Sequence, residues 1–393
     1  MGVIKCGTVD VFNAFCGDHD ITDVLCDETV ICGDNRCYDN RSLTIVNAPA
    51  ACKELSFVGN ATSGGFWGGR DENSVATNTF YTYSLSGNTL TFTSHALVNN
   101  VETNVHPGLN ESLNNIPSWL WGHCMVGTAT SGVIFLSHYN VNSPGSPSSG
   151  EVKRYSPVAG GIEIRPCLPN RFGAGTPASP SRIIGAHYNR TEGARGVGTI
   201  NSGLVFRGTA RVGAVHVPEH WFIYTTTHNH VGVSGRSWQG GHVITMLGTE
   251  GDDFTARGWS GMVGDTSSGL IFGGRDVGIG RFNEFIRYIV GNGAVKTKIL
   301  NNRGSIPPMS NMAMVGTKEA GLIYGGHLSN GDMNQNAYRY DVQDDDVHIT
   351  QMARCTNFFP RWQGGLYGGD INSGFIYGGP YGNDEAYKYA VEG

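Results

Sequence analysis

The chain alternates short apolar runs with short polar turns, and one arrangement of these runs recurs six times. Each copy has an apolar run ending in glycine, a polar turn, usually Ser-Gly, three apolar residues and, in most copies, Gly-Gly. Two apolar runs joined by such a turn are typical of a tight antiparallel hairpin. The closing Gly-Gly is expected where the backbone needs positive φ or approaches a neighbour closely. The copies are FVGNATSGGFWGG (57–69), MVGTATSGVIF (125–135), GVGTINSGLVF (196–206), MVGDTSSGLIFGG (262–274), MVGTKEAGLIYGG (314–326) and LYGGDINSGFIYGG (366–379).

Two further runs follow most hairpins. The third run always closes on a tyrosine, and the fourth alternates apolar and polar residues as an outer strand does. Four short strands per copy, repeated six times, predict an all-β fold: a six-bladed β-propeller of four-stranded antiparallel blades. The tyrosines are Tyr83, Tyr155, Tyr224, Tyr288, Tyr340 and Tyr389, and the fourth runs are 90–93, 162–164, 243–245, 295–299 and 347–350.

The sixth copy lacks a fourth run after its tyrosine strand. A strand of suitable composition, Leu43-Thr44-Ile45-Val46, stands just before the first copy. We expect it to complete the sixth blade and so close the ring with the N-terminal end. The domain organisation predicted is therefore a Cys-rich N-terminal arm at 1–40 and a propeller at 41–393.

These motifs resemble a known family. A hydrophobic-Gly-Gly segment followed by a tyrosine strand resembles the kelch repeat, and the fuller VGT-x-x-[SA]G pattern is similar to kelch-like repeats of bacteriophage tail-fibre and virion proteins. The resemblance covers roughly residues 43–393. It departs from the kelch pattern in lacking a regular blade tryptophan, and the second and third copies lack an intact Gly-Gly. It implies a propeller fold and a place in a virion, as a tail fibre or other surface appendage.

Composition and charge narrow the classes of partner and function that the chain can have. The net charge is −6 without a basic stripe, so no nucleic-acid partner is expected. No apolar run is long enough for a transmembrane helix, so no membrane insertion is expected. The histidines and carboxylates of the repeats are scattered, which favours a protein that is not an enzyme and uses no cofactor.

The arm holds five of the nine cysteines. Cys26, Cys32 and Cys37 are weak candidates for a metal site, because they are not spaced as close Cys-x-x-Cys pairs. The alternative is packing thiols or disulfides in a small segment with little core. The sequence leaves both alternatives open.

Length variation between copies points to one face of the propeller. The first turns of the copies are short and uniform, whereas the connections after the second strand and between blades vary in length. Variable insertions on one face of a repeat scaffold usually mark its binding face. The variable connections are 137–150, 207–219 and 327–336 within blades, and 98–121, 168–194 and 246–260 between them. The candidate binding residues on this face are Arg70, Asp71, His138, Tyr139, Trp221, Arg275, Asp276 and His327.

The function predicted is that of a phage virion structural protein. Its arm would dock onto other virion proteins, with both chain ends opposite the variable face. That face would recognise a host surface glycan or protein, in multiple copies per particle. Three alternatives remain: a carbohydrate-active enzyme on the same fold, a purely architectural capsid or tail protein, and Arg-Asp pairs that are only structural salt bridges.

Overall fold

The computed structural model describes residues 4–6, 9–11 and most of 41–390. The gaps of four residues or more are at 51–54, 99–122, 136–151, 167–192, 207–210, 217–220, 232–236, 353–365 and 379–385. Within the described part every regular element is a β-strand, and the strands form several separate sheets. The prediction of an all-β fold is confirmed.

The strands fall into six repeat units that follow the six copies in the sequence. In each unit, consecutive strands pair antiparallel, so that the hairpin, the tyrosine strand and the outer strand lie side by side. Unit 1 consists of β5 (Ser56–Gly59), β6 (Ser63–Trp67), β7 (Phe80–Ser86) and β8 (Thr89–His95), and unit 2 of β10 (Cys124–Gly127), β11 (Gly132–Phe135), β12 (Val152–Val158) and β13 (Gly161–Pro166). Unit 3 consists of β14 (Arg195–Gly198), β15 (Ser202–Phe206), β18 (Trp221–Thr227) and β21 (Gly241–Gly251), and unit 4 of β22 (Gly261–Gly264), β23 (Ser268–Phe272), β26 (Phe285–Val290) and β27 (Ala294–Arg303). Unit 5 consists of β29 (Ala313–Gly316), β30 (Ala320–Tyr324), β32 (Ala337–Gln343) and β33 (Asp346–Gln351), and unit 6 of β34 (Leu366–Gly369), β35 (Ser373–Tyr377) and β36 (Ala386–Ala390), joined by β3 (Arg41–Ser42).

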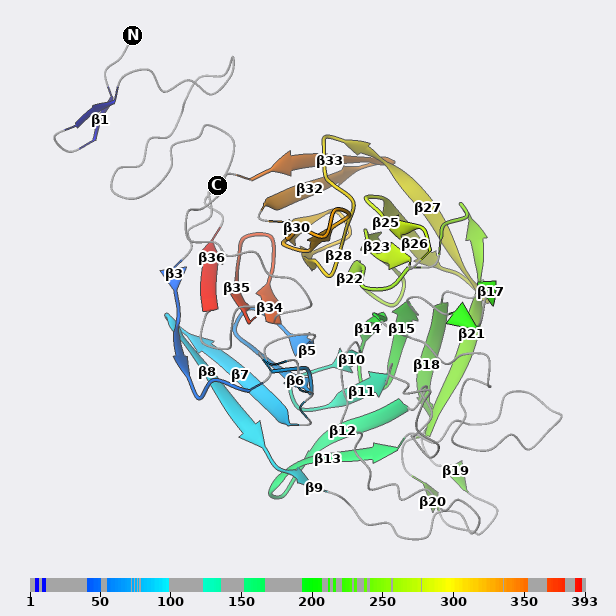
Figure 1. The fold of residues 1–393 in the computed structure, drawn as a ribbon. Coiled ribbons are helices and arrows are strands. Elements are labelled where there is room, and N and C mark those ends of the chain that lie inside the picture. Colours follow the sequence, from blue (N-terminus) through cyan, green and yellow to red (C-terminus); the bar gives the residue numbers. More distant parts are fainter. Residues whose placement is uncertain are drawn as a thin grey trace.

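The units are arranged around a common centre (Figure 1). The first strand of each unit is innermost and touches the first strands of the units before and after it. The contacts run from β5 to β10, β14, β22, β29 and β34, and then return to β5. Buried apolar side chains fill the space between adjacent units, as where Phe206 of unit 3 packs with Ile271 of unit 4.

The outer strands are joined into a belt around the circumference. Within the described residues, short parallel pairs link the end of one outer strand to the next unit's outer strand at four junctions. β9 (Leu97–Val98) pairs with β13, the end of β21 pairs with β27, the end of β27 pairs with β33, and β4 (Thr44–Val46) pairs with β8. The expectation of a loop from residue 246 is wrong in part, because β21 continues to Gly251 to make its pair.

The N-terminal strand that pairs with unit 6 lies slightly earlier than the sequence predicts. Arg41 and Ser42 pair antiparallel with β36, and the Leu43 amide donates to the carbonyl of Ala386 at 2.9 Å. Residues 44–46, predicted to belong to this strand, instead form β4 and pair with β8 of unit 1. One stretch of chain thus contacts both the last unit and the first.

A hydrogen bond from each tyrosine explains why that residue recurs. Each hydroxyl donates to the carbonyl oxygen of the first residue in its own unit's turn, over 2.6 to 2.9 Å. The ring lies across the glycine after the turn, where a Cβ would come within 2.3 to 2.5 Å of the hydroxyl oxygen. The six tyrosine–turn pairs are Tyr83–Asn60, Tyr155–Thr128, Tyr224–Thr199, Tyr288–Asp265, Tyr340–Thr317 and Tyr389–Asp370.

Replacing Tyr340 by phenylalanine tests the value of one such bond. The substitution keeps the ring but removes a 2.7 Å hydrogen bond to Thr317, and is expected to cost about 1 to 2 kcal/mol of unfolding free energy. Tyr338→Phe is the matched control, since among the described residues its hydroxyl has only a long 3.4 Å contact with Asn336. Denaturant unfolding measures both variants, and equal losses would contradict the account.

Burial of these tyrosines predicts a loss of stability in alkali. Burial raises the pKa of five of the hydroxyls well above 10. In the unfolded chain they ionise near the ordinary value of about 10, so only the unfolded state releases protons there. The free energy of unfolding that these protonated hydroxyls contribute is therefore fully present below about pH 10 and is lost as the pH rises further. Unfolding at about pH 9 and 11, with phenolate absorbance of the native protein, measures this; phenolate formation by these side chains before unfolding would contradict it.

Little of the predicted arm lies within the described residues. β1 (Ile4–Cys6) pairs antiparallel with β2 (Val9–Val11). Cys26, Cys32 and Cys37 lie outside the described residues, so the metal site and its alternatives stay predictions.

Candidate ligand-binding face

The Gly-Gly pairs turn the chain out of each sheet and into a variable segment. Gly273 and Gly274 have φ of 61° and 100°, a region that side chains with a Cβ rarely adopt. The corresponding pairs of units 1 and 5 also have positive φ. This conformation confirms the expectation from the sequence.

In unit 4 the segment after Gly-Gly forms a second small hairpin. β24 (Arg275–Asp276) pairs with β25 (Gly280–Arg281), with Arg275 directly opposite Arg281. The Asp276 carboxylate accepts the amides of Gly278 and Ile279 at 2.7 and 3.0 Å and is almost fully buried. Asp276 therefore shapes the turn and is not presented at the surface as predicted.

The hairpin of unit 4 is continuous with the equivalent segment of unit 5. Met309 exchanges backbone hydrogen bonds with Gly274 and Phe282, and the strand β28 (Met309–Ser310) pairs with β31 (His327–Leu328). This connection brings Arg275 and His327, which are 52 positions apart in the sequence, into one patch. Arg281 lies between them.

Arg281 is held by two neighbours. Its Nε donates to the Ser310 hydroxyl at 3.0 Å, and its Nη2 lies 2.7 Å from Nδ1 of His327. Because a guanidinium can only donate, Nδ1 must accept, and the imidazole proton is on Nε2, 2.7 Å from the carbonyl oxygen of Gly331. His327 is neutral in this arrangement.

The electrostatics of the patch favour that neutral form. Burial lowers the pKa of His327, and the charges of Arg281 and Arg275 lower it further, against the opposing effects of Gly331 and Asp332. Burial and the charge of Arg275 also lower the pKa of Arg281. Among the described residues, neither of these two arginines makes an ion pair with a carboxylate.

A buried arginine supports the hairpin from below. Arg257 is fully buried, donates to Glu284 at 2.7 Å, and places its guanidinium carbon 3.8 Å from the centre of the Phe282 ring. The next residue, Gly258, forms a backbone bridge with Arg275. The base of the hairpin is therefore anchored to a packed, ion-paired layer.

The other predicted residues are distributed as follows. Arg70 and Asp71 follow the Gly-Gly of unit 1, and the Asp71 carboxylate accepts the amide of Val75 at 2.7 Å, as Asp276 does in its own turn. His138 and Tyr139 lie outside the described residues.

Trp221 does not belong to this face. Its side chain is 0% exposed and packs between the rings of Phe206 and Tyr288, with centroids 5.0 Å away in both cases. The prediction that it lies on the variable face is wrong, because the start of β18 faces the core between units 3 and 4.

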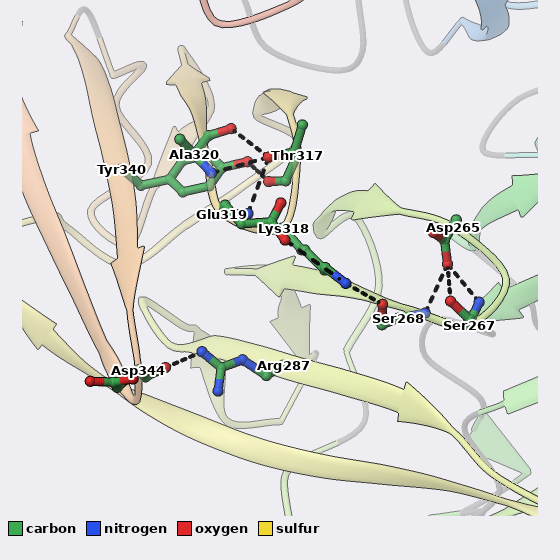
Figure 2. A network of polar contacts seen from close by, with 10 residues as sticks. All are labelled: Asp265, Ser267, Ser268, Arg287, Thr317, Lys318, Glu319, Ala320, Tyr340 and Asp344. Atoms are coloured by element: carbon green, nitrogen blue, oxygen red, sulfur yellow. Dashed lines mark hydrogen bonds and ion pairs between the residues drawn. The ribbon is translucent and has the colours of Figure 1, made fainter.

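The opposite face carries the uniform turns, which are satisfied by their own side chains. The Asp265 carboxylate accepts from Ser267 and from the Ser268 amide, and these bonds lower its pKa. In unit 5 the Thr317 hydroxyl accepts from the backbone amides of Glu319 and Ala320 in the same way. Lys318 of this turn donates to the Ser268 hydroxyl of unit 4 at 2.8 Å. Figure 2 shows these contacts, together with the bond from Arg287 to the carbonyl of Asp344 that also joins the two units.

The sequence reasoning missed Arg281 and Ser310. Arg281 could have been found from the spacing Arg-Asp-Val-Gly-Ile-Gly-Arg, in which a glycine-rich turn places two arginines opposite each other. Ser310 offered no such signal, because it approaches from a connection between two units.

The described residues contain no group of three or more His, Cys, Asp or Glu side chains arranged to hold a metal ion. The same residues include no helix long and apolar enough to cross a membrane.

Comparison with known proteins supports the fold alone. No protein-family model matches the chain, and no curated protein sequence matches it. Among solved structures, one described as the structure of YjhT is similar, with a TM-score of 0.53 and 9% identity over 88% of this chain and 99% of that one.

Proposed function

We propose that the chain is a six-bladed, kelch-like β-propeller that residues 41–43 close by completing the sixth blade. Three observations support this architecture: the four-stranded pattern of the units, the cyclic order of contacts between their inner strands, and the hydrogen bond from Leu43 to Ala386. The structural likeness to YjhT extends over most of both chains.

We further propose that this propeller is a virion structural protein, a tail-fibre or tail-tip component, whose variable face recognises a host surface glycan or protein. The observation that carries the recognition proposal is the difference between the two faces. The uniform turns satisfy their polar groups internally, whereas the face after the Gly-Gly of unit 4 presents Arg275 and Arg281, which have no carboxylate partner among the described residues. Unpaired charge at a surface is available for a partner.

The N-terminal arm of residues 1–40 would dock the protein onto other virion proteins. Display in several copies per particle would raise the avidity of a weak single site. The assignment to a virion rests on the resemblance of the repeat motif, and the assignment of the face rests on its chemistry.

Two measurements with the full chain test the proposal. Mass spectrometry and antibody labelling of purified particles, from the virus that encodes the chain, should detect it on a surface appendage. Binding of the purified chain to host-cell envelopes should then be saturable. Absence from the particle would contradict the virion role; presence without envelope binding would favour an architectural protein, and turnover of an envelope polysaccharide would favour an enzyme.

A further inference from the structure

We propose that Arg275 and Arg281, with Ser310 and His327 behind them, form a site for a single anionic group, a carboxylate or phosphate carried by a surface glycan. The anion site follows from the geometry of this patch, and only the glycan source rests on the proposed function. Three features of the patch support the site: its unbalanced charge, the way in which the guanidinium groups are held, and the small extent of the positive charge.

The charge of the hairpin is unbalanced. Arg275 and Arg281 are direct cross-strand partners, so their side chains leave the hairpin on the same face. Like charges opposite one another destabilise a strand pair, and the described residues place no carboxylate in ion-pair range of either. A bound anion would convert this repulsion into two attractions.

The nearby carboxylates are already engaged elsewhere. Asp276 accepts two turn amides, and Glu284 pairs with Arg257. Asp332 lies near His327, and its charge raises the pKa of that imidazole. The Asp332 carboxylate accepts a hydrogen bond from the side-chain amide of Asn330 at 2.6 Å. These interactions leave the two arginines as the uncompensated charges of the patch.

The guanidinium of Arg281 is pre-oriented. Ser310 and His327 occupy its Nε and Nη2 donors, while Nη1 makes no hydrogen bond among the described residues. A fixed planar fork loses little conformational freedom on binding an anion. The neutral imidazole accepts from Arg281 and adds no repulsion, and the facing arginine supplies donors from the other strand.

The extent of the charge indicates a small anionic group rather than a polyanion. The whole chain carries a net charge of −6, so the patch is a local exception to a negative protein. Long-range attraction of nucleic acid needs a broad basic surface. The hairpin tip beside the arginines carries Ile279, which is 64% exposed and can contact the apolar face of a sugar.

Titration of the full chain with sodium D-glucuronate, inorganic phosphate and neutral D-glucose, followed by NMR or calorimetry, tests the site. Glucuronate or phosphate should bind and glucose should not. Arg275→Gln and Arg281→Gln should each lower the affinity for the anion by about tenfold. Arg303→Gln is the matched control, because it removes the same charge from an arginine that is ion-paired to Asp346 on the outer strands.

Thermal unfolding separates a binding role from a structural one. Arg275→Gln relieves the repulsion, so its midpoint should equal or exceed that of the natural chain while its affinity falls, and Arg275→Lys should recover part of the affinity. The proposal is overturned if neither anion binds, or if both glutamine variants bind as tightly as the Arg303→Gln control.

The outcome is distinguishable from that of the proposed function. Envelope binding that survives both arginine substitutions would overturn the anion site and leave host recognition standing. If the natural chain binds the anion, Arg275→Gln does not, and the chain is absent from the particle, the anion site is supported and the virion role is overturned.

Discussion

Replacing Gly269 by alanine is expected to cost about 3 to 5 kcal/mol of unfolding free energy, despite the addition of only one carbon. The new Cβ would lie 2.2 Å from the carbonyl oxygen of Val263 and 2.4 Å from the hydroxyl oxygen of Tyr288. One of these atoms belongs to the backbone of the paired strand, and the other is fixed by its bond to Asp265. Relief therefore requires separating β22 from β23 or displacing the buried ring.

Gly291→Ala is the matched control for that experiment. Its added carbon would meet only the Ala294 carbonyl, at an ordinary 3.5 Å, so the expected change is within about 0.5 kcal/mol. Denaturant-induced unfolding compares the two variants at equal slope. If both variants lost the same small amount of unfolding free energy, the Tyr288 ring could not lie across the turn glycine.

Replacing Leu43 by proline is the second substitution with a large expected effect, about 3 to 6 kcal/mol. Proline removes the amide that donates to Ala386, leaving that carbonyl without its donor. The side chain of Leu43 is also buried, in a cluster with Phe375 and Tyr377 of unit 6. The substitution therefore acts on the bond and on the packing at the same time.

Leu43→Ala isolates the packing contribution, because it keeps the amide. It should lose about 2 to 3 kcal/mol, and Leu43→Pro should exceed it by about 1 to 3 kcal/mol. A chain with an unpaired β36 should also associate through the exposed edge, which size-exclusion chromatography measures. Identical stabilities for the two variants would mean that the backbone bond contributes nothing.

The strands could be predicted from the sequence because each unit is encoded locally. The turn, the glycine beneath Tyr288 and the alternating outer strand all lie within one copy, and repetition averages out the ambiguity of any single run. The Gly-Gly conformation is local in the same sense. The inner hairpins, the tyrosine strands and the outer strands of units 1 to 5 accordingly cover the predicted residues.

The features that could not be predicted depend on contacts between units. The run Leu43–Val46 reads as a strand, but its composition does not reveal that its two ends pair with different sheets. The sequence predicts a surface position for Trp221, because its burial between units 3 and 4 depends on packing between units. The patch around Arg281 likewise needed Ser310, which approaches from the connection between units 4 and 5.

The proposed architecture depends on closure of the ring, which hydrogen–deuterium exchange of the native protein can measure. If the six units close through residues 41–43, peptides covering 41–46 and 386–390 should exchange as slowly as the tyrosine strand β32, because all would open only with the whole ring. Rapid exchange of those two peptides beside a protected β32 would mean an open edge at β36, and would contradict the closed ring.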